Sequence, residues 1–357
     1  MSNSDYTKMN EYIQLLQKLV STQSFSREEE NAARIMRDFL TGKNIPFQQK
    51  GNNTWAKNKY WNDRLPVILL NSHIDTVKPA KGYTRDPFQP DIEDGKLYGL
   101  GSNDAGGPLV TLLAVFVHFF LKKDLPFNLI YAATAEEEVS GTNGVESILG
   151  KLGTIDFAIV GEPTGMQMAI AEKGLMVLDC MAYGKSGHAA RNEGINAIYK
   201  AISDIGIIRN YKFKKASDLL GEVKMTVSMI NAGTQHNVIP DQCSFVIDVR
   251  TNEHYSNEKA CEIIDKLIES KVKARSFRLN SSGIPVSHPF VQRGISLGLN
   301  YYGSPTTSDQ AVIPSPSIKI GPGESARSHT ADEFIYVDEI EKAFGIYINL
   351  LDGLQLK

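Results

Sequence analysis

Three apolar segments of the chain end in acidic residues or histidine, and this shared pattern constrains the fold more than any other feature. They read PVILLNSHID at 66–75, NLIYAATAEEE at 128–138 and FAIVGEP at 157–163. Continuous apolar runs of this kind are typical of strands that are buried on both faces. A long apolar stretch at 108–121 indicates a buried helix between the first two runs. The alternation predicts an α/β fold, with a mixed, largely parallel sheet and helices on both of its faces.

The polar ends of these segments predict where a functional site lies. In open α/β sheets, ligands bind outside the carboxyl ends of the strands. The first segment ends in His73 and Asp75, the second in Glu136, Glu137 and Glu138, and the third in Glu162. Polar residues that merely lie on the surface would not have to occur at the same end of all three segments. We therefore expect these side chains to share one site.

The middle of the chain has a different character and predicts a second domain. Residues 175–184, 224–233 and 243–251 have strand patterns, and 193–209 and 256–272 have helical ones. We therefore expect an inserted α+β domain at 175–281. Residues 1–174 and 282–357 then form a discontinuous catalytic domain that closes with a helix at 338–351. A chain of 357 residues is long enough for two hydrophobic cores.

Composition excludes several classes of partner. The net charge of −3 gives no electrostatic case for binding nucleic acid or an anionic membrane. The apolar stretch at 108–121 is too short to span a bilayer comfortably, and the first residues lack a secretory pattern. Three widely spaced cysteines indicate neither a disulfide framework nor a cysteine zinc site. These features predict a cytoplasmic protein.

The acids and histidines near the predicted strand ends and loops suit a hydrolytic metal site. Imidazole and carboxylate ligands without thiolate favour zinc, cobalt or manganese. Two histidines and three carboxylates would serve two metal ions that share one bridging carboxylate. Each motif alone also has an ordinary structural explanation, such as a helix cap, a turn or a solvated loop. The full set is His73, Asp75, Asp104, Glu137, Glu138, Glu162 and His329.

As an ordered set, the short motifs resemble a known family over nearly the whole chain. The motifs are HID, GSNDAGG, AEEE, GEPT, GKSGHAA, NVIP and SHTADE. They resemble the co-catalytic, dinuclear zinc metallopeptidases, a family that contains acetylornithine deacetylase, succinyl-diaminopimelate desuccinylase, aminoacylase and the glutamate-releasing carboxypeptidases. The resemblance implies that His73 and Glu162 bind one metal and that Asp104 bridges to the second. It also implies that His329 binds the second metal and that Asp75 orients the imidazole of His73.

The three consecutive glutamates, 136–138, must be assigned to the roles of base and metal ligand. The family pattern is commonly Asp-Glu-Glu, in which the middle residue is the general base and the last is a metal ligand. By this resemblance Glu137 is the base and Glu138 a ligand of the second metal. Glu138 stands 34 residues after Asp104 and 24 before Glu162, which resembles the family spacing. The alternative register assigns the two roles to Glu136 and Glu137.

The inserted domain carries three further candidates by the same resemblance. His188 in GKSGHAA resembles a catalytic histidine that family members contribute from the partner subunit, which implies a homodimer. The alternative is a histidine in a glycine-rich turn without a catalytic part. Asn237 in NVIP and Arg250 in DVR match positions near the substrate's carboxylate. A guanidinium suits bidentate carboxylate binding, although Arg250 could equally pair with a neighbouring acid.

The resemblance also implies a reaction. The segment GPGESARSH at 321–329 and the compact length most resemble acetylornithine deacetylase, so we expect a zinc- or cobalt-dependent hydrolase of N-acetyl-L-ornithine in arginine biosynthesis. The alternatives within the class are desuccinylation of N-succinyl-ornithine or of succinyl-diaminopimelate, and then a dipeptidase or aminopeptidase. From another class, the chain could be a non-catalytic binding scaffold that has lost its metals. All five ligand positions hold suitable residues, which argues against a scaffold.

Overall fold

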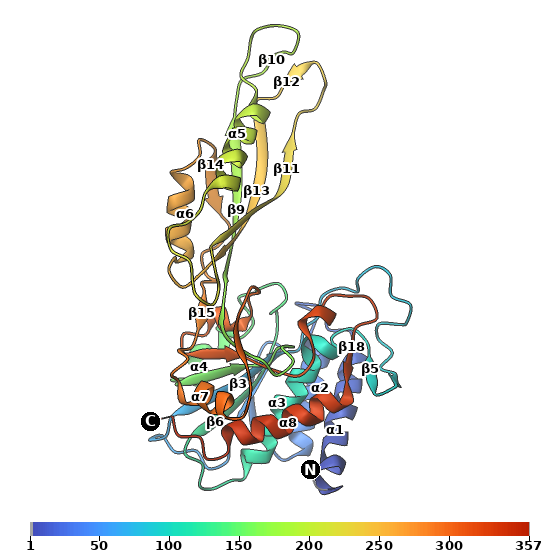
Figure 1. Cartoon of the computed structure of the whole chain (residues 1–357). Coiled ribbons are helices and arrows are strands. Elements are labelled where there is room, and N and C mark those ends of the chain that lie inside the picture. Colours follow the sequence, from blue (N-terminus) through green and yellow to red (C-terminus); the bar gives the residue numbers. More distant parts are fainter. Residues whose placement is uncertain (1–2, 357) are drawn as a thin grey trace. The chain divides into compact units, whose positions relative to one another are not determined.

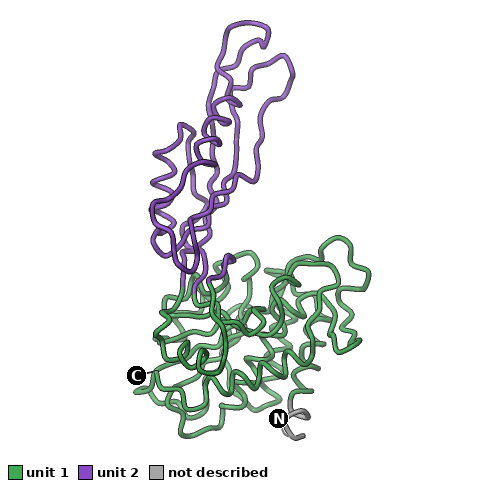
Figure 2. The backbone as a smooth tube through the Cα atoms, viewed as in Figure 1, with its two compact units in different colours: residues 1–170, 283–302, 308–357 green, residues 171–282, 303–307 purple. Residues whose placement is uncertain are grey.

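The structure is a computed structural model that describes residues 3–356. The chain divides into two compact units (Figure 2). Unit 1 comprises residues 1–170, 283–302 and 308–357, and unit 2 comprises 171–282 and 303–307. The insertion predicted from the sequence was 175–281. The short segment 303–307 also belongs to unit 2, although residues 283–302 of unit 1 separate it from the insertion, and nothing in its composition distinguishes it from its neighbours.

A mixed sheet with a parallel centre organises unit 1, as predicted (Figure 1). The strand β3 (Val67–His73) pairs in parallel with β6 (Asn128–Thr134) and β7 (Phe157–Val160), and β17 (Ser317–Lys319) pairs in parallel with β7. Antiparallel strands extend both edges. Within the described residues the order is β1 (Phe47–Lys50), β2 (Asn53–Lys57), β6 (Asn128–Thr134), β3 (Val67–His73), β7 (Phe157–Val160), β17 (Ser317–Lys319), β8 (Met168–Glu172) and β15 (Ser282–Gly283), with β16 (Tyr301–Ser304) also paired to β8.

Both faces of this sheet are covered, which explains why its central strands are apolar without interruption. Val67 and Leu69 pack into one apolar cluster, which includes helix α4 (Glu146–Leu152). Ile68 and Leu70 point to the opposite face and join a larger cluster. That cluster is built with the helices α1 (Asn3–Val20), α2 (Glu30–Gly42), α3 (Gly107–Phe120), α7 (Pro289–Ser296) and α8 (Val337–Leu351). Because neither face of β3 is exposed to solvent, its sequence does not alternate between apolar and polar residues.

Helix α3 is the most apolar helix of the described chain and lies in the core. By length and composition alone, the helical stretch Ser102–Phe120 could cross a membrane. However, 83% of this apolar stretch is buried inside the protein. It contacts α1, α8 and the strands β3 and β6. This apolar surface is therefore covered by protein, as in the core helix of a globular fold.

The strand register brings the polar segment ends to one edge of the sheet. His73 at the end of β3 is the partner of Thr134 at the end of β6. Asn71 in β3 and Lys319 in β17 are both partners of Val160, the last residue of β7. The residues that follow β3, β6 and β7 therefore leave the sheet on the same side. A small sheet of β4 (Ile92–Glu93), β5 (Lys96–Tyr98) and β18 (Phe334–Tyr336) also belongs to unit 1.

Unit 2 has an antiparallel sheet with helices packed on one face. The described strand order is β11 (Lys224–Ala232), β13 (Gln242–Thr251), β9 (Gly174–Tyr183) and β14 (Lys271–Ala274). Helices α5 (Ala197–Asn210) and α6 (Asn257–Asp265) cover it. The predicted helix at 256–272 is wrong beyond Asp265, because residues 271–274 pair with β9 as an edge strand. Tertiary pairing overrides the local pattern there.

Candidate dinuclear metal site

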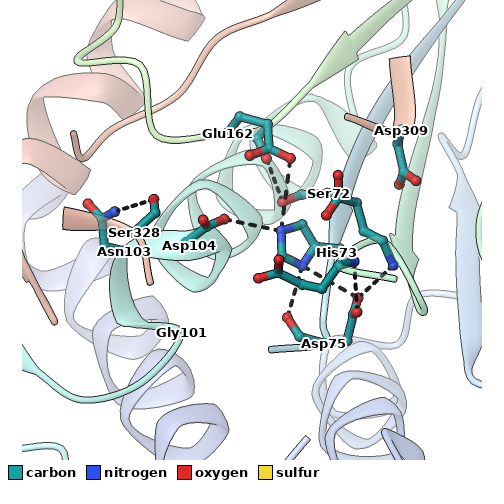
Figure 3. Close-up of polar contacts among 12 residues, drawn as sticks. Ser72, His73, Asp75, Gly101, Asn103, Asp104, Glu162, Asp309 and Ser328 are labelled. Carbon is teal, nitrogen blue, oxygen red and sulfur yellow. Dashed lines mark hydrogen bonds and ion pairs between the residues drawn. The ribbon is translucent and has the colours of Figure 1, made fainter. Parts of the chain in front are cut away.

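His73 is the centre of the site and is almost completely buried. It is 2% exposed and is the last residue of β3. Its Nε2 atom lies 3.3 Å from Oδ1 of Asp104 and 3.9 Å from Oε1 of Glu162. Its Nδ1 atom lies 2.9 Å from the backbone oxygen of Asp75, at hydrogen-bond distance. Figure 3 shows the imidazole between Asp104 and Glu162 on one side and Asp75 on the other.

Asp104 faces both predicted metal-binding histidines. Its Oδ1 atom lies near His73, and its Oδ2 atom lies 3.6 Å from Nε2 of His329. The residue lies in a turn that precedes α3, and the turn begins at Gly101 with φ of +75°. A Cβ atom on Gly101 would come within 2.5 Å of the side chain of Thr76, so this position requires glycine. One carboxylate with its two oxygens directed at two imidazoles has the geometry of a bridging ligand.

Glu138 and His329 form the more open half of the site. Nε2 of His329 lies 3.0 Å from Oε2 of Glu138. The side chain of His329 is 52% exposed, whereas that of Glu138 is only 7% exposed. His329 has φ of +58° and lies in the segment between the short turn at Ser325–Arg327 and β18.

The backbone of the glutamate triplet is held by Asp75. The carboxylate of Asp75 accepts hydrogen bonds from the N–H groups of Glu137 (3.0 Å) and Glu138 (3.1 Å). It also accepts one from the hydroxyl of Ser26 (2.7 Å). Asp75 was predicted to orient His73, but Nδ1 of His73 is 3.5 Å from its carboxylate and closer to its backbone oxygen. The carboxylate therefore orients the triplet more directly than it orients the imidazole.

Glu136 is directed to a different environment from Glu137 and Glu138. Its carboxylate accepts hydrogen bonds from the side-chain amide (3.0 Å) and the backbone N–H (3.4 Å) of Asn143. A Cβ atom on Gly141 would come within 1.9 Å of its Oε2 atom, so glycine makes room for this carboxylate. By contrast, Glu138 groups with His73 and Asp104, with ligand atoms within 4.8 Å of one another. Glu137 groups in the same way with His73 and Glu162.

The electrostatics of the buried half favour a cation. Burial alone lowers the pKa of His73, but Asp104 and Asp75 outweigh burial and raise it well above the usual value. Burial and the neighbouring Asp104 raise the pKa of Glu162 to about 8. Burial and Glu162 raise the pKa of Glu137 well above its usual value. The carboxylates repel one another here, and positive charge at the centre relieves this repulsion.

Two buried atoms test whether metal ions fit. Among the residues that the structure describes, Nε2 of His73 and Oε1 of Glu138 are buried without a hydrogen-bond partner. Buried polar atoms are rarely left in this state unless an ion or an ordered water satisfies them. His73 and Glu138 are both members of the group formed with Asp104. When all four are ionised, the nearby carboxylates of Asp104, Glu137, Glu138 and Glu162 carry four negative charges, which two divalent cations would balance.

Four supporting residues were not identified from the sequence. Glu333 is 2% exposed, and its carboxylate accepts hydrogen bonds from backbone N–H groups of the turn that contains Asp104. Burial and Asp104 raise the pKa of Glu333 to about 8. Burial raises the pKa of Asp309 to about 6. The carboxylate of Asp309 accepts hydrogen bonds from Asn71 (2.8 Å) and Thr134 (3.1 Å). A polar residue inside an otherwise apolar strand, such as Asn71, is the one sequence signal that could have pointed to this network.

The three candidates in the inserted domain all belong to unit 2. His188 is exposed in β10 (Gly187–His188), and its Nδ1 atom accepts a hydrogen bond from the N–H of Ala190. β10 pairs with β12 (Val238–Ile239), and the N–H of Ala189 donates to the backbone oxygen of Asn237. His188 and Asn237 therefore lie on neighbouring segments. The guanidinium of Arg250 forms two hydrogen bonds with Asp248, at 2.8 and 3.1 Å.

The fold and the donor set define a class of protein, the metallohydrolases with an α/β catalytic unit. The chain belongs to the peptidase family M20/M25/M40, whose family model matches residues 69–353. A curated relative from Wolbachia pipientis wMel, named succinyl-diaminopimelate desuccinylase, is 27% identical, and the match covers 96% of this chain and 92% of the relative. The protein is therefore a metal-dependent hydrolase that acts on amide bonds.

Solved structures show the same fold. A tripeptidase from Staphylococcus aureus superposes with a TM-score of 0.77 at 19% identity, and the match covers 99% of both chains. A dinuclear metal-binding peptidase of the M20 family from Bacillus subtilis superposes with a TM-score of 0.74 at 16% identity, covering 99% of this chain and 100% of that one. The expected two-domain α/β architecture is confirmed.

Proposed function

We propose that this protein removes the acyl group from an N-acyl amino acid with the help of two divalent metal ions, zinc or cobalt. The observation that carries the proposal is the position of Asp104, whose two oxygens face different histidines at 3.3 and 3.6 Å. In this proposal, His73, Asp104 and Glu162 hold one ion. Asp104, Glu138 and His329 hold the other.

Glu137 is the general base in this proposal. When bound, the metal pair supplies a polarised carbonyl and a water of lowered pKa. The carboxylate of Glu137 takes the proton of the attacking water and later donates it to the departing amine nitrogen. Burial and Glu162 raise the pKa of Glu137, which suits a group that must both accept and release a proton. Asp75 holds it in place through its backbone N–H.

Unit 2 supplies the remaining roles in this proposal. As the family resemblance implies, His188 is contributed by the second copy in a homodimer and donates a hydrogen bond to the oxyanion that forms at the substrate carbonyl. Arg250 and Asn237 bind the carboxylate of the amino acid. The guanidinium of Arg250 is paired with the neighbouring Asp248, which is the alternative that the sequence left open for this residue. Its planar geometry suits bidentate carboxylate binding, which supports the proposed role. A substrate carboxylate would then compete with Asp248 for the same guanidinium.

Two acyl groups, acetyl and succinyl, are candidates for the group that is removed from the natural substrate. N-acetyl-L-ornithine, and with it a place in arginine biosynthesis, is supported by the segment 321–329. A succinyl group, on ornithine or diaminopimelate, is supported by the names of the curated relatives. Intermediates of amino-acid biosynthesis and a net charge of −3 are in keeping with a cytoplasmic protein that binds neither nucleic acid nor membranes.

A substrate panel with metal control tests this function. The purified protein is treated with EDTA, restored with zinc or cobalt, and assayed on acetyl-ornithine, succinyl-ornithine, succinyl-diaminopimelate, acetyl-methionine and a dipeptide. We expect one N-acyl amino acid to be cleaved with the highest kcat/KM, and activity to vanish with EDTA and return with metal. Preference for the dipeptide would refute the deacylase proposal. Indifference to both chelation and metal would favour a non-catalytic scaffold.

We also propose a homodimer formed through unit 2. The edge strand β11 exposes Met229 (56%) and Ile230 (51%), and α5 exposes Tyr199 (70%) and Ile202 (56%). An exposed apolar edge strand is a ready site for pairing with another chain. Sedimentation of the wild type should give a dimer, and Met229→Lys should shift it to the monomer. Leu121→Lys, which changes an equally exposed leucine of unit 1 (61%), is the matched control and should remain dimeric. A monomeric wild type contradicts the proposal.

A further inference from the structure

The turn that carries Asp104 has a supporting partner outside the predicted ligand set. Residues 101–104 lie between β5 and α3, and their backbone N–H groups need acceptors because the region is buried. The carboxylate of Glu333 supplies them. Its Oε2 atom accepts from the N–H of Gly101 (3.0 Å), and its Oε1 atom accepts from those of Asn103 (2.9 Å) and Asp104 (2.9 Å).

Glu333 also belongs to the chain segment that carries His329. The backbone oxygen of Glu333 accepts a hydrogen bond from the N–H of Gly99 (2.9 Å), which lies just before the turn. The backbone and the side chain of Glu333 therefore both bind this part of the chain. Burial at 2% exposure shields these bonds from water. The relative position of Asp104 and His329 therefore depends on contacts of a residue that touches neither proposed metal position.

A second residue joins the same two segments. The side-chain amide of Asn103 donates to the backbone oxygen of Glu324 (3.1 Å) and to the hydroxyl of Ser328 (3.3 Å). Its Oδ1 atom accepts from the N–H of Glu324 (3.0 Å). Figure 3 shows Asn103 and Ser328 side by side, with Asp104 on the adjacent backbone. The turn at 101–104 and the segment 324–333 thus behave as one hydrogen-bonded assembly.

We propose that Glu333 is a positioning residue of the metal centre, which sets the geometry between the bridging Asp104 and His329 by holding three backbone N–H groups of the Asp104 turn. The proposal rests on the proposed dinuclear function. Substitution by glutamine leaves one of the two acceptor oxygens, so at least one N–H group loses its partner. We expect the second metal position, shared by Asp104 and His329, to be weakened more than the first.

The test compares Glu333→Gln with Asp332→Asn. Asp332 is the adjacent acid and accepts the backbone N–H groups of Thr84 (2.9 Å) and Arg85 (3.1 Å), away from the proposed ligands, so it is a matched control. Each metal-free protein is titrated with Co²⁺ in competition with a chelator, and the visible absorption of the bound cobalt is recorded. Loss of a partner of this kind typically lowers metal affinity about 10- to 100-fold. We expect that loss for one of the two ions in Glu333→Gln, with an altered cobalt spectrum, and no change in Asp332→Asn.

A second variant and separate readouts keep the outcomes distinct. Glu333→Asp retains the charge but shortens the side chain, and we expect weakened binding of one ion with less destabilisation than in Glu333→Gln. It serves as the test if the glutamine variant does not fold. Wild-type affinity and spectrum in the folded variants would overturn the proposal, even if their melting temperatures fall. Failure of the wild type to bind cobalt would instead refute the dinuclear function itself.

Discussion

The two histidines of the site differ in their surroundings. His73 ends a central strand and has 1% of its side chain exposed, whereas His329 lies in an irregular segment with 52% exposed. The buried half is built on the rigid core, where β3, β6 and β7 are in register. The open half depends on hydrogen bonds between two non-regular segments. The comparison indicates that removing a ligand affects both stability and metal binding in the buried half, but chiefly metal binding in the open half.

The largest expected effect concerns the base, which groups with the buried half. Glu137→Gln should lower kcat by about 10²- to 10⁴-fold while both metal ions remain bound, because only proton transfer is lost. Steady-state kinetics and metal analysis measure this. Glu136→Gln is the matched control, since its carboxylate is held by Asn143, and it should retain most of its activity. If Glu136→Gln abolishes turnover while Glu137→Gln loses a metal ion, the register is shifted by one residue.

The next prediction compares the two histidines directly. His73→Ala should lose metal and also lower the melting temperature, because it leaves a cavity and unpaired carboxylates in a buried site. A cost of about 1–3 kcal/mol is expected for such unsatisfied groups. His329→Ala should lose one ion with a smaller change in stability, since the imidazole is half exposed. Metal analysis and thermal denaturation provide the test. Equal destabilisation of the two variants would remove the distinction.

Metal removal should make stability depend on pH. The pKa of Glu162 is raised from 4.5 to about 8 in the fold, so its favourable contribution is complete below pH 4.5 and disappears as the pH rises through 8. The raised pKa of His73 acts in the same direction above pH 6.5. The melting temperature of the EDTA-treated protein should therefore fall from pH 5 to 8 relative to the zinc-loaded protein. Each kcal/mol corresponds to roughly 2–4 °C. Parallel melting curves would contradict this.

The smallest effect is expected at a support of the buried half. Ser26→Ala removes the hydroxyl that donates to Asp75 at 2.7 Å. Because the backbone N–H groups of Glu137 and Glu138 still bond to this carboxylate, the change should cost only about 0.5–1.5 kcal/mol of stability and leave both metals bound. Ser21→Ala is the control, because that hydroxyl bonds only to the exposed backbone oxygen of Lys18. Denaturant unfolding compares the two. Equal loss in both would show that Asp75 does not depend on Ser26.

Much of the fold followed from the sequence, because burial on both faces forces continuous apolar strands. The runs ending at His73 and Glu162 predicted β3 and β7 and the edge of the sheet where the polar residues gather. The helix at 256–272 was predicted too long, because the pairing of residues 271–274 with β9 depends on a strand about 90 residues away in the sequence. Local patterns carry no information about such partners.

The sequence by itself determined the central strands, the expectation of a second domain and the chemical types of the candidate ligands, since these depend on local hydrophobicity and on the order of short motifs. The tertiary structure decided which acids face His73, how the glutamate triplet turns at Glu136, and which carboxylate supports the Asp104 turn. Glu333 lies 229 residues from Asp104 along the chain. Only folding brings the two together, because a buried N–H group takes its acceptor from whatever lies beside it in space.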